Sequence, residues 1–188
     1  MRPAVFLDRD GTLIEESGYL DRLDRLAFFP FSADAVRLLN RAGLAVVVAT
    51  NQSGIARGLV KEAFIAEVHR HITETLAAGN ARIDAFYYCP HHPDGTLESY
   101  RQDCDCRKPQ PGMLRQAASD LGLDLARSFV VGDRWQDLIA GHAVGARTIL
   151  VRTGYGRISE AEAPEAFTPD VVADNLMAAV SWILRQKP

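Results

Sequence analysis

The sequence lacks most of the features that mark specialised proteins. Only three of its 188 residues are cysteine, and all three lie in one stretch, which argues against a disulfide framework. The formal net charge is only −3, which argues against a protein that binds mainly to nucleic-acid backbones. There is no internal repeat, and no apolar run approaches the ~20 residues that span a bilayer. The N-terminal MRPAVFLDRDGTL has too short an apolar run for a signal peptide. We therefore expect a soluble, cytoplasmic monomer that binds neither nucleic acid nor membrane.

What the sequence does contain is a regular alternation of short apolar runs and helical patterns. The apolar runs predict strands over 3–8, 44–50, 83–88, 128–133, 147–153 and 169–174. The helical patterns predict helices over 33–42, 60–79, 111–121, 136–144 and 175–186, with Ser32 capping the first and Gly122 ending the third. This order predicts one α/β domain over residues 1–188, a Rossmann-like, doubly wound parallel sheet with helices on both faces. In such a sheet, ligands bind at the carboxyl ends of the strands.

Three of the predicted strands end in polar side chains suited to phosphate or metal. These residues are Asp8 and Asp10, Thr50 and Asn51, and Asp133 and Asp137. Carboxylates gathered at one point repel each other unless a divalent cation is present, and hard oxygen ligands suit Mg²⁺. Within DRDGTL alone, the two aspartates could be mere turn formers. The convergence of three distant segments favours a magnesium and phosphate site instead.

These segments carry a family resemblance. DRDGTL, the TN pair at 50–51, Lys108 ahead of a helix and GDRWQD at 132–137 resemble the four motifs of the haloacid dehalogenase-like (HAD) phosphohydrolases. The resemblance implies that Asp8 is a nucleophile that forms an aspartyl-phosphate. It also implies that Asp10 protonates the leaving oxygen and then deprotonates the hydrolytic water.

The same resemblance implies how phosphate and metal are held. Thr50 and Lys108 would hold the phosphoryl oxygens. The ligands of Mg²⁺ would be the Asp8 carboxylate, the Asp10 backbone carbonyl and Asp133, with Asp137 just behind them.

The substrate must be selected by loops, because no segment is long enough for the cap domain that many HAD phosphatases carry. A capless, open site follows from the short segments 11–49 and 52–107. The candidate substrate-binding residues are Glu16, Ser17, Gly18, Tyr19, Asn51, Gln52, Ser53, Arg57, Arg107 and Arg134. Arg57 and Arg107 could hold a second anionic group, since arginine suits bidentate phosphate contacts. The alternative for Arg57 is a solvated surface charge.

The cysteine stretch, CPHHPDGTLESYRQDCDCRKP at 89–109, is a long loop that something must order. Cys89, Cys104 and Cys106, with His91 or His92, supply the Cys₃His set of a structural zinc site. Four protein ligands leave no open position on the metal, so this zinc would fix Arg107 and Lys108 in place and do no chemistry. A redox dithiol or free buried cysteines are the alternatives.

Longer strings allow a narrower resemblance along nearly the entire chain. YLDRLDRLAFFPF, TNQSGIARG, YYCPHHPDG and CDCRKPQPGML resemble the heptose bisphosphate phosphatases, in the histidinol-phosphatase-related branch of the HAD superfamily. The resemblance implies that His91 is the zinc ligand. It also implies removal of the C7 phosphate from a sugar bisphosphate, D-glycero-D-manno-heptose 1,7-bisphosphate, in nucleotide-activated heptose (lipopolysaccharide core precursor) biosynthesis. Arg134 stands where lysine is common in that family, and Trp135 is atypical there.

Three other functions stay open from the sequence. A histidinol-phosphate phosphatase shares these motifs, but its substrate carries an amine and would leave Arg57 and Arg107 without a role. A DNA 3′-phosphatase fits an open site but not the acidic net charge. A non-catalytic, zinc-stapled binding module would have no need of Asp8, Asp10 and Asp133, which are all present.

Overall fold

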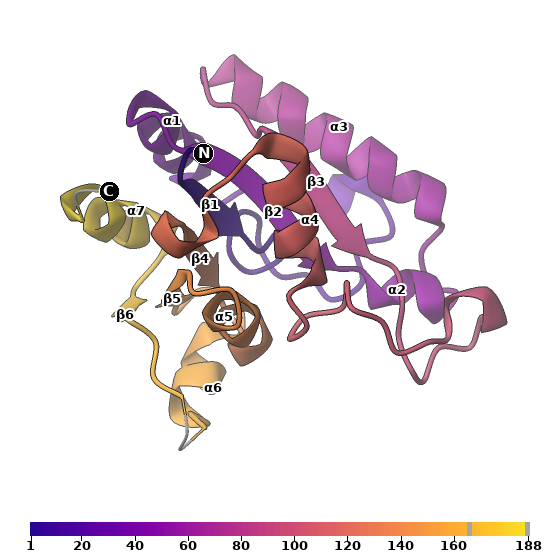
Figure 1. Cartoon of the computed structure of the whole chain (residues 1–188). Coiled ribbons are helices and arrows are strands. Elements are labelled where there is room, and N and C mark those ends of the chain that lie inside the picture. Colours follow the sequence, from indigo (N-terminus) through magenta and orange to yellow (C-terminus); the bar gives the residue numbers. More distant parts are fainter. Residues whose placement is uncertain (165–166, 187–188) are drawn as a thin grey trace.

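Six parallel strands form one sheet in the computed structural model, which describes residues 1–164 and 167–186. The strands are β1 (Ala4–Leu7), β2 (Ala45–Asn51), β3 (Ala85–Cys89), β4 (Phe129–Gly132), β5 (Arg147–Val151) and β6 (Val171–Ala173). Their order is β3-β2-β1-β4-β5-β6 (Figure 1), so the chain reverses its direction of progress between β1 and β4. Leu7 pairs with Val48 of β2 and Val131 of β4, which brings three strand ends together. The doubly wound α/β fold predicted from the sequence is confirmed.

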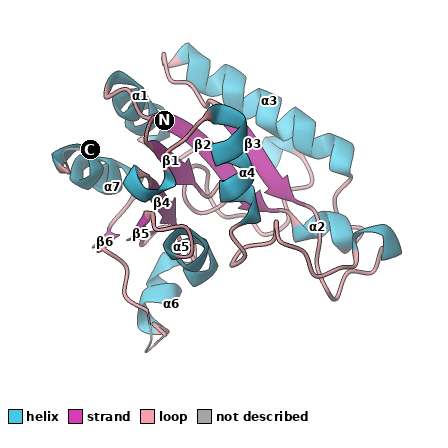
Figure 2. Ribbon diagram, in the orientation of Figure 1, coloured by secondary structure: helices cyan, strands magenta, loops and turns pink. Residues whose placement is uncertain are grey.

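Helices flank the sheet on both sides (Figure 2). They are α1 (Ser32–Arg41), α2 (Ser53–Ala56), α3 (Glu62–Ala78), α4 (Gly112–Leu121), α5 (Trp135–His142), α6 (Gly156–Ala161) and α7 (Leu176–Arg185), with 3₁₀ turns η1 (Leu23–Arg25), η2 (Glu98–Tyr100) and η3 (Leu125–Arg127). The two short helices α2 and α6 lie where the sequence predicted loops. None of the helices in the described part of the chain has both the length and the apolar character needed to cross a bilayer.

The strand side chains alternate between two cores. Val5 and Leu7 pack with residues of α1, α3 and α7 on one face of the sheet. Ala4 and Phe6 pack with residues of α4 on the other face. All four side chains are buried, so the continuous apolar run in β1 reflects a strand that is covered on both sides.

The expected cap of the first helix is wrong. Ser32 lies inside the first turn of α1, and Phe31 occupies the cap position without a side-chain hydrogen bond. The Ser32 hydroxyl donates instead to the carbonyl of Leu13 at 2.6 Å, which ties α1 to the loop after β1. The end of α4 is as predicted, because Gly122 adopts the left-handed conformation with φ of 63° that stops a helix.

No folded cap covers the carboxyl edge of the sheet within residues 11–107, all of which the structure describes. Between β1 and β2 the chain forms only η1 and α1, and between β2 and α4 only α2, α3, β3 and η2. The prediction of a capless core is confirmed for this part of the chain.

Candidate functional site

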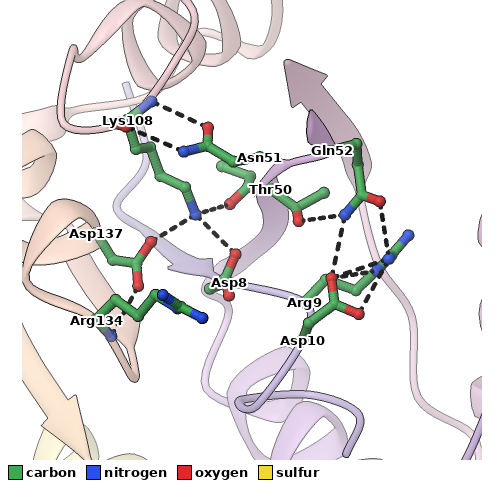
Figure 3. Close-up of polar contacts among 10 residues, drawn as sticks. Asp8, Arg9, Asp10, Thr50, Asn51, Gln52, Lys108, Arg134 and Asp137 are labelled. Atoms are coloured by element: carbon green, nitrogen blue, oxygen red, sulfur yellow. Dashed lines mark hydrogen bonds and ion pairs between the residues drawn. The ribbon is translucent and has the colours of Figure 1, made fainter. Parts of the chain in front are cut away.

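Lys108 connects the ends of β1 and β2 with the first turn of α5. Its Nζ lies 2.7 Å from Oδ1 of Asp8 and 2.6 Å from Oδ1 of Asp137, and it donates to the Ala49 carbonyl at 2.6 Å (Figure 3). Burial opposes the ammonium charge, but Asp137 and Asp8 outweigh it and raise the pKa of Lys108 above its ordinary value. A fixed positive charge therefore lies beside the carboxylate of Asp8.

Asn51 holds Lys108, which follows a long loop, in its place beside Asp8 and Asp137. Its side-chain amide donates to the Lys108 carbonyl at 3.0 Å and accepts from the Lys108 backbone N–H at 3.0 Å. Both polar groups of the amide are thereby used inside the protein. Asn51 borders the cavity above Asp8, but its amide positions Lys108.

Three carboxylates meet beside Lys108. One oxygen each of Asp8, Asp133 and Asp137 lies within 4.8 Å of the others. Burial raises the pKa of Asp8 to about 7, opposed by Lys108 and reinforced by Asp137 and Asp10. Burial likewise raises the pKa of Asp133 to about 8, and the charges on Asp8 and Asp137 add to the effect. Such a cluster is costly in the ionised form without a cation.

The donor set fits Mg²⁺. Oδ1 of Asp133 is buried and has no hydrogen-bond partner among the described residues, so an acceptor is available for a cation. Oδ1 of Asp137 contacts Lys108, and its Oδ2 accepts from the backbone N–H of Arg134 at 3.1 Å. Asp8 and Asp133 are therefore better placed as direct ligands than Asp137. Carboxylate oxygens with few protein positions are typical of Mg²⁺.

The turn after β5 supports Asp133, and the sequence predictions did not include it. The backbone N–H of Tyr155 donates to Oδ2 of Asp133 at 2.7 Å, and the Thr153 hydroxyl donates to the Gly11 carbonyl at 2.6 Å. Gly11 and Gly154 have φ of 80° and 56°, and a Cβ on either would meet the Asp133 carboxylate. The signal for this turn was TGYG at the carboxyl end of a predicted strand.

Arg9 is a further residue of the site that the sequence predictions did not include. Its side chain is almost fully buried, and its Nε and Nη2 donate to the two oxygens of Asp10 at 3.0 Å each. Gln52 donates from Nε2 to Oδ2 of Asp10 at 3.1 Å and to Oγ1 of Thr50 at 2.9 Å (Figure 3). Arg9 and Gln52 thus orient the carboxyl group expected to transfer protons.

A cavity of about 330 Å³ opens above Asp8. Its lining includes eight of the ten residues predicted to bind substrate: Glu16, Gly18, Tyr19, Asn51, Gln52, Ser53, Arg107 and Arg134. Two described residues from that prediction, Ser17 and Arg57, lie outside the lining. The Ser17 carbonyl accepts from Arg25 at 2.7 Å, and Nη2 of Arg57 lies 3.3 Å from Nε2 of His92. The roles predicted for these two residues have no direct support from the cavity.

The cysteine loop brings four ligand atoms to one point. The closest pair is Sγ of Cys89 and Sγ of Cys106, at 2.7 Å, and the widest is Sγ of Cys89 and Nδ1 of His91, at 3.8 Å. All three cysteines are free thiols. Burial raises the pKa of Cys89 to about 11, so a thiolate there needs a cation. His92 points elsewhere, since its Nδ1 accepts from the Asp94 backbone N–H. Three sulfurs and one imidazole nitrogen suit a tetrahedral zinc ion.

Comparison with known proteins places these features in a family. A model of the HAD-hydrolase-like family matches residues 105–179. The D-glycero-beta-D-manno-heptose-1,7-bisphosphate 7-phosphatase of Salmonella typhi is 45% identical over 92% of this chain and 92% of its own. The enzyme of that name from Escherichia coli (strain K12) is also 45% identical, over 92% of this chain and 91% of its own. This chain belongs to that phosphatase family.

A solved structure supports the family assignment. The crystal structure of D,D-heptose 1,7-bisphosphate phosphatase from B. bronchiseptica, complexed with magnesium and phosphate, matches with a TM-score of 0.87. It is 36% identical, and the match covers 100% of both chains. The sequence motifs predicted membership of the heptose bisphosphate phosphatase family, and these comparisons confirm it. They also confirm its class, a phosphoric monoester hydrolase rather than a non-catalytic module.

Proposed function

We propose that this chain removes the C7 phosphate from D-glycero-beta-D-manno-heptose 1,7-bisphosphate, a step toward nucleotide-activated heptose for the lipopolysaccharide core. The observation that carries the proposal is one cavity that is lined by Asp8, the carboxylate that Lys108 contacts from behind, and also by the cations Arg107 and Arg134. A sugar with two phosphates needs both a reaction centre and a second anion site. Histidinol phosphate, with an amine in place of the second phosphate, would use neither arginine.

The first half of the reaction forms a phosphoenzyme. An oxygen of Asp8 attacks the C7 phosphorus in line, the new O–P bond forms, and the bond from phosphorus to the sugar oxygen breaks. Asp10 gives its proton to that departing oxygen. Lys108 and the Thr50 hydroxyl hold the equatorial phosphoryl oxygens and stabilise the charge spread over them. Asp8, Asp133 and the Asp10 backbone carbonyl would hold Mg²⁺, which neutralises phosphate charge when bound.

The second half restores the enzyme. A water molecule attacks the phosphorus of the aspartyl-phosphate, Asp10 takes the proton, and inorganic phosphate leaves with the Asp8 carboxylate regenerated. Oδ2 of Asp10 accepts from both Arg9 and Gln52, whereas Oδ1 accepts from Arg9 alone. Oδ1 therefore has the spare acceptor capacity for the proton of water.

The loop over 89–106 acts as a zinc clamp in this proposal. Cys89, His91, Cys104 and Cys106 would hold zinc with every coordination position taken by protein, so the metal would order the chain and would not activate water. Cys106 precedes Arg107 and Lys108 directly, so the clamp fixes both cations. We further propose that the enzyme works as a cytoplasmic monomer, a state that light scattering after gel filtration would check.

A phosphate-release screen tests the function. The full chain, supplied with Mg²⁺ and Zn²⁺, is assayed with both anomers of heptose 1,7-bisphosphate, with fructose 1,6-bisphosphate and with histidinol phosphate. We expect the highest kcat/KM for the beta anomer, and ³¹P NMR should show that only the C7 phosphate is released. Equal or better turnover of histidinol phosphate would overturn the assignment.

A further inference from the structure

Arg134 lies over an aromatic ring at the wall of the cavity. Its Cζ is 3.7 Å from the centroid of the Tyr155 ring, well inside the range of a cation–π contact. Both residues line the cavity that contains Asp8. The face of the guanidinium is covered by the ring, whereas the N–H groups lie in the plane of the guanidinium and point away from its edges.

The two partners are each fixed to the carboxylate cluster. The backbone N–H of Arg134 donates to Asp137 at 3.1 Å, and that of Tyr155 donates to Asp133 at 2.7 Å. Trp135 adds a link between the two segments, because its Nε1 donates to the Ser159 carbonyl at 2.7 Å. The start of α5 is thus joined to α6, and the cation–π pair lies in a wall held by these three hydrogen bonds.

The charge on Arg134 is open to a ligand. Across residues 1–164 and 167–186, no carboxylate lies within 4.0 Å of its guanidinium. Its field reaches across the cavity to Glu16, where burial raises the pKa of that carboxyl and Arg134 is among the charges that oppose the rise. In Figure 3 the side chain extends from the start of α5 in the direction of Asp8.

We propose that Tyr155 is a positioning residue that presents Arg134 to the second phosphate of the substrate, the one that is not hydrolysed. The inference rests on the proposed function and adds a specificity-determining pair to it. The ring limits the rotamers of a long, flexible side chain and leaves its N–H fork available for bidentate contact with phosphate oxygens. A lysine at this position would present a point charge with neither the flat face nor the fork.

The experiment compares sugar bisphosphates with their monophosphates. Heptose 1,7-bisphosphate and heptose 7-phosphate, and fructose 1,6-bisphosphate and fructose 6-phosphate, are measured as competitive inhibitors of p-nitrophenyl phosphate hydrolysis. Tyr155→Leu should lower the preference for each bisphosphate over its monophosphate by about fivefold, the size of a partly desolvated cation–π contact. Tyr155→Phe, which keeps the ring, should restore the preference.

A double-mutant cycle separates positioning from a general loosening of the site. In an Arg134→Met background, Tyr155→Leu should cause no further loss of bisphosphate preference, because Tyr155 acts through Arg134. The proposal is overturned if Tyr155→Leu weakens bisphosphate and monophosphate equally, or if its effect persists without Arg134. A different result would separate the two proposals. If Tyr155→Leu lowers the bisphosphate preference but wild-type enzyme does not hydrolyse heptose 1,7-bisphosphate, the proposed function fails, while the role of Tyr155 and Arg134 in anion binding is kept.

Discussion

Nζ of Lys108 lies 2.7 Å from Oδ1 of Asp8, across 100 positions of sequence. This contact places a cation beside the group that must approach a phosphate dianion. The same ammonium contacts Asp137 at 2.6 Å, so one residue compensates two buried carboxylates and faces the reaction centre as well. We therefore expect catalysis and stability to be coupled at Lys108.

Replacement of that lysine tests the coupling. We expect Lys108→Met to lower kcat by at least about 10²-fold, since charge on the transferring phosphoryl group loses its stabilisation. In metal-free buffer the free energy of unfolding should fall by about 3–5 kcal/mol, because buried carboxylates lose their partner. Steady-state kinetics and urea unfolding measure both effects. Lys61→Met, at an exposed position, is the matched control, and a full-activity Lys108→Met enzyme would refute the role.

The nucleophile can be tested by an isosteric change. Asp8→Asn should abolish turnover while the circular dichroism spectrum and thermal unfolding stay native, because the amide keeps an oxygen for Lys108 and relieves repulsion in the cluster. Acid-quenched wild-type enzyme should yield an Asp8 peptide heavier by one phosphate, and the variant should not. Retained turnover would show that another residue attacks phosphorus.

The turn behind Asp133 should be sensitive to a single methyl group. Gly154→Ala adds a Cβ that would meet the Asp133 carboxylate and a Gly11 atom at a φ of 56°. We expect the Mg²⁺ concentration for half-maximal activity to rise about tenfold or more, by analogy with disturbed metal-ligand supports. Gly145→Ala is the control, because Gly145 has φ of 76° but no atom near its Cβ position. Equal effects of the two variants would point to backbone strain alone.

Loss of one thiol should release the zinc. Cys106→Ser removes a ligand that lies 2.7 Å from Cys89, and mass spectrometry of the native protein should show no bound zinc. We expect KM to rise more than kcat falls, because Arg107 loses its anchor while Asn51 still holds Lys108. Wild-type enzyme stripped by a chelator should behave in the same way. Unchanged kinetics in zinc-free protein would show that the clamp is dispensable.

His69 should make the protein less stable in acid. The ring stacks on Phe86 at 4.4 Å, its Nε2 has no partner among the described residues, and burial, followed by the charge of Arg9, lowers its pKa to about 4. Between pH 6.5 and 4 the unfolded chain binds a proton at this histidine that the folded chain does not bind. The free energy of unfolding therefore decreases as the pH falls, by about 3 kcal/mol at pH 4. His69→Phe should flatten the curve in this window and leave it parallel above pH 7. Urea unfolding across pH 4–8 decides, and identical slopes would contradict the assignment.

The strand-end residues were predictable because parallel strands share one carboxyl edge. Asp8, Thr50 and Asp133 each follow an apolar run, so their meeting follows from topology. Arg9 was not predictable, because a charged residue in a turn defaults to solvent. It is buried only because Asp10 and Gln52 happen to accept its donors.

Tertiary contacts also explain the other features that the sequence did not predict. The Ser32 hydroxyl could bond within its own helix or to a carbonyl 19 positions away, and only the fold selects the second partner. The helix α6 spans six residues, too few for a helical period to show in the sequence. Arg134 was predicted from the sequence as a substrate-binding residue. The Tyr155 ring that it contacts lies 21 positions further on, and no local sequence signal links the two.

The Asn51–Lys108 contact is one of the anchors of the loop that precedes Lys108. Asn51 holds Lys108 by both backbone groups, and the four clamp ligands sit at the two ends of the loop. The span over 93–103 lies between these anchors and packs on α2, where the Leu97 N–H donates to the Ala56 carbonyl at 2.9 Å. Because no residue of this span lines the cavity, we expect replacements within it to alter its packing on α2 and to leave Lys108 in place.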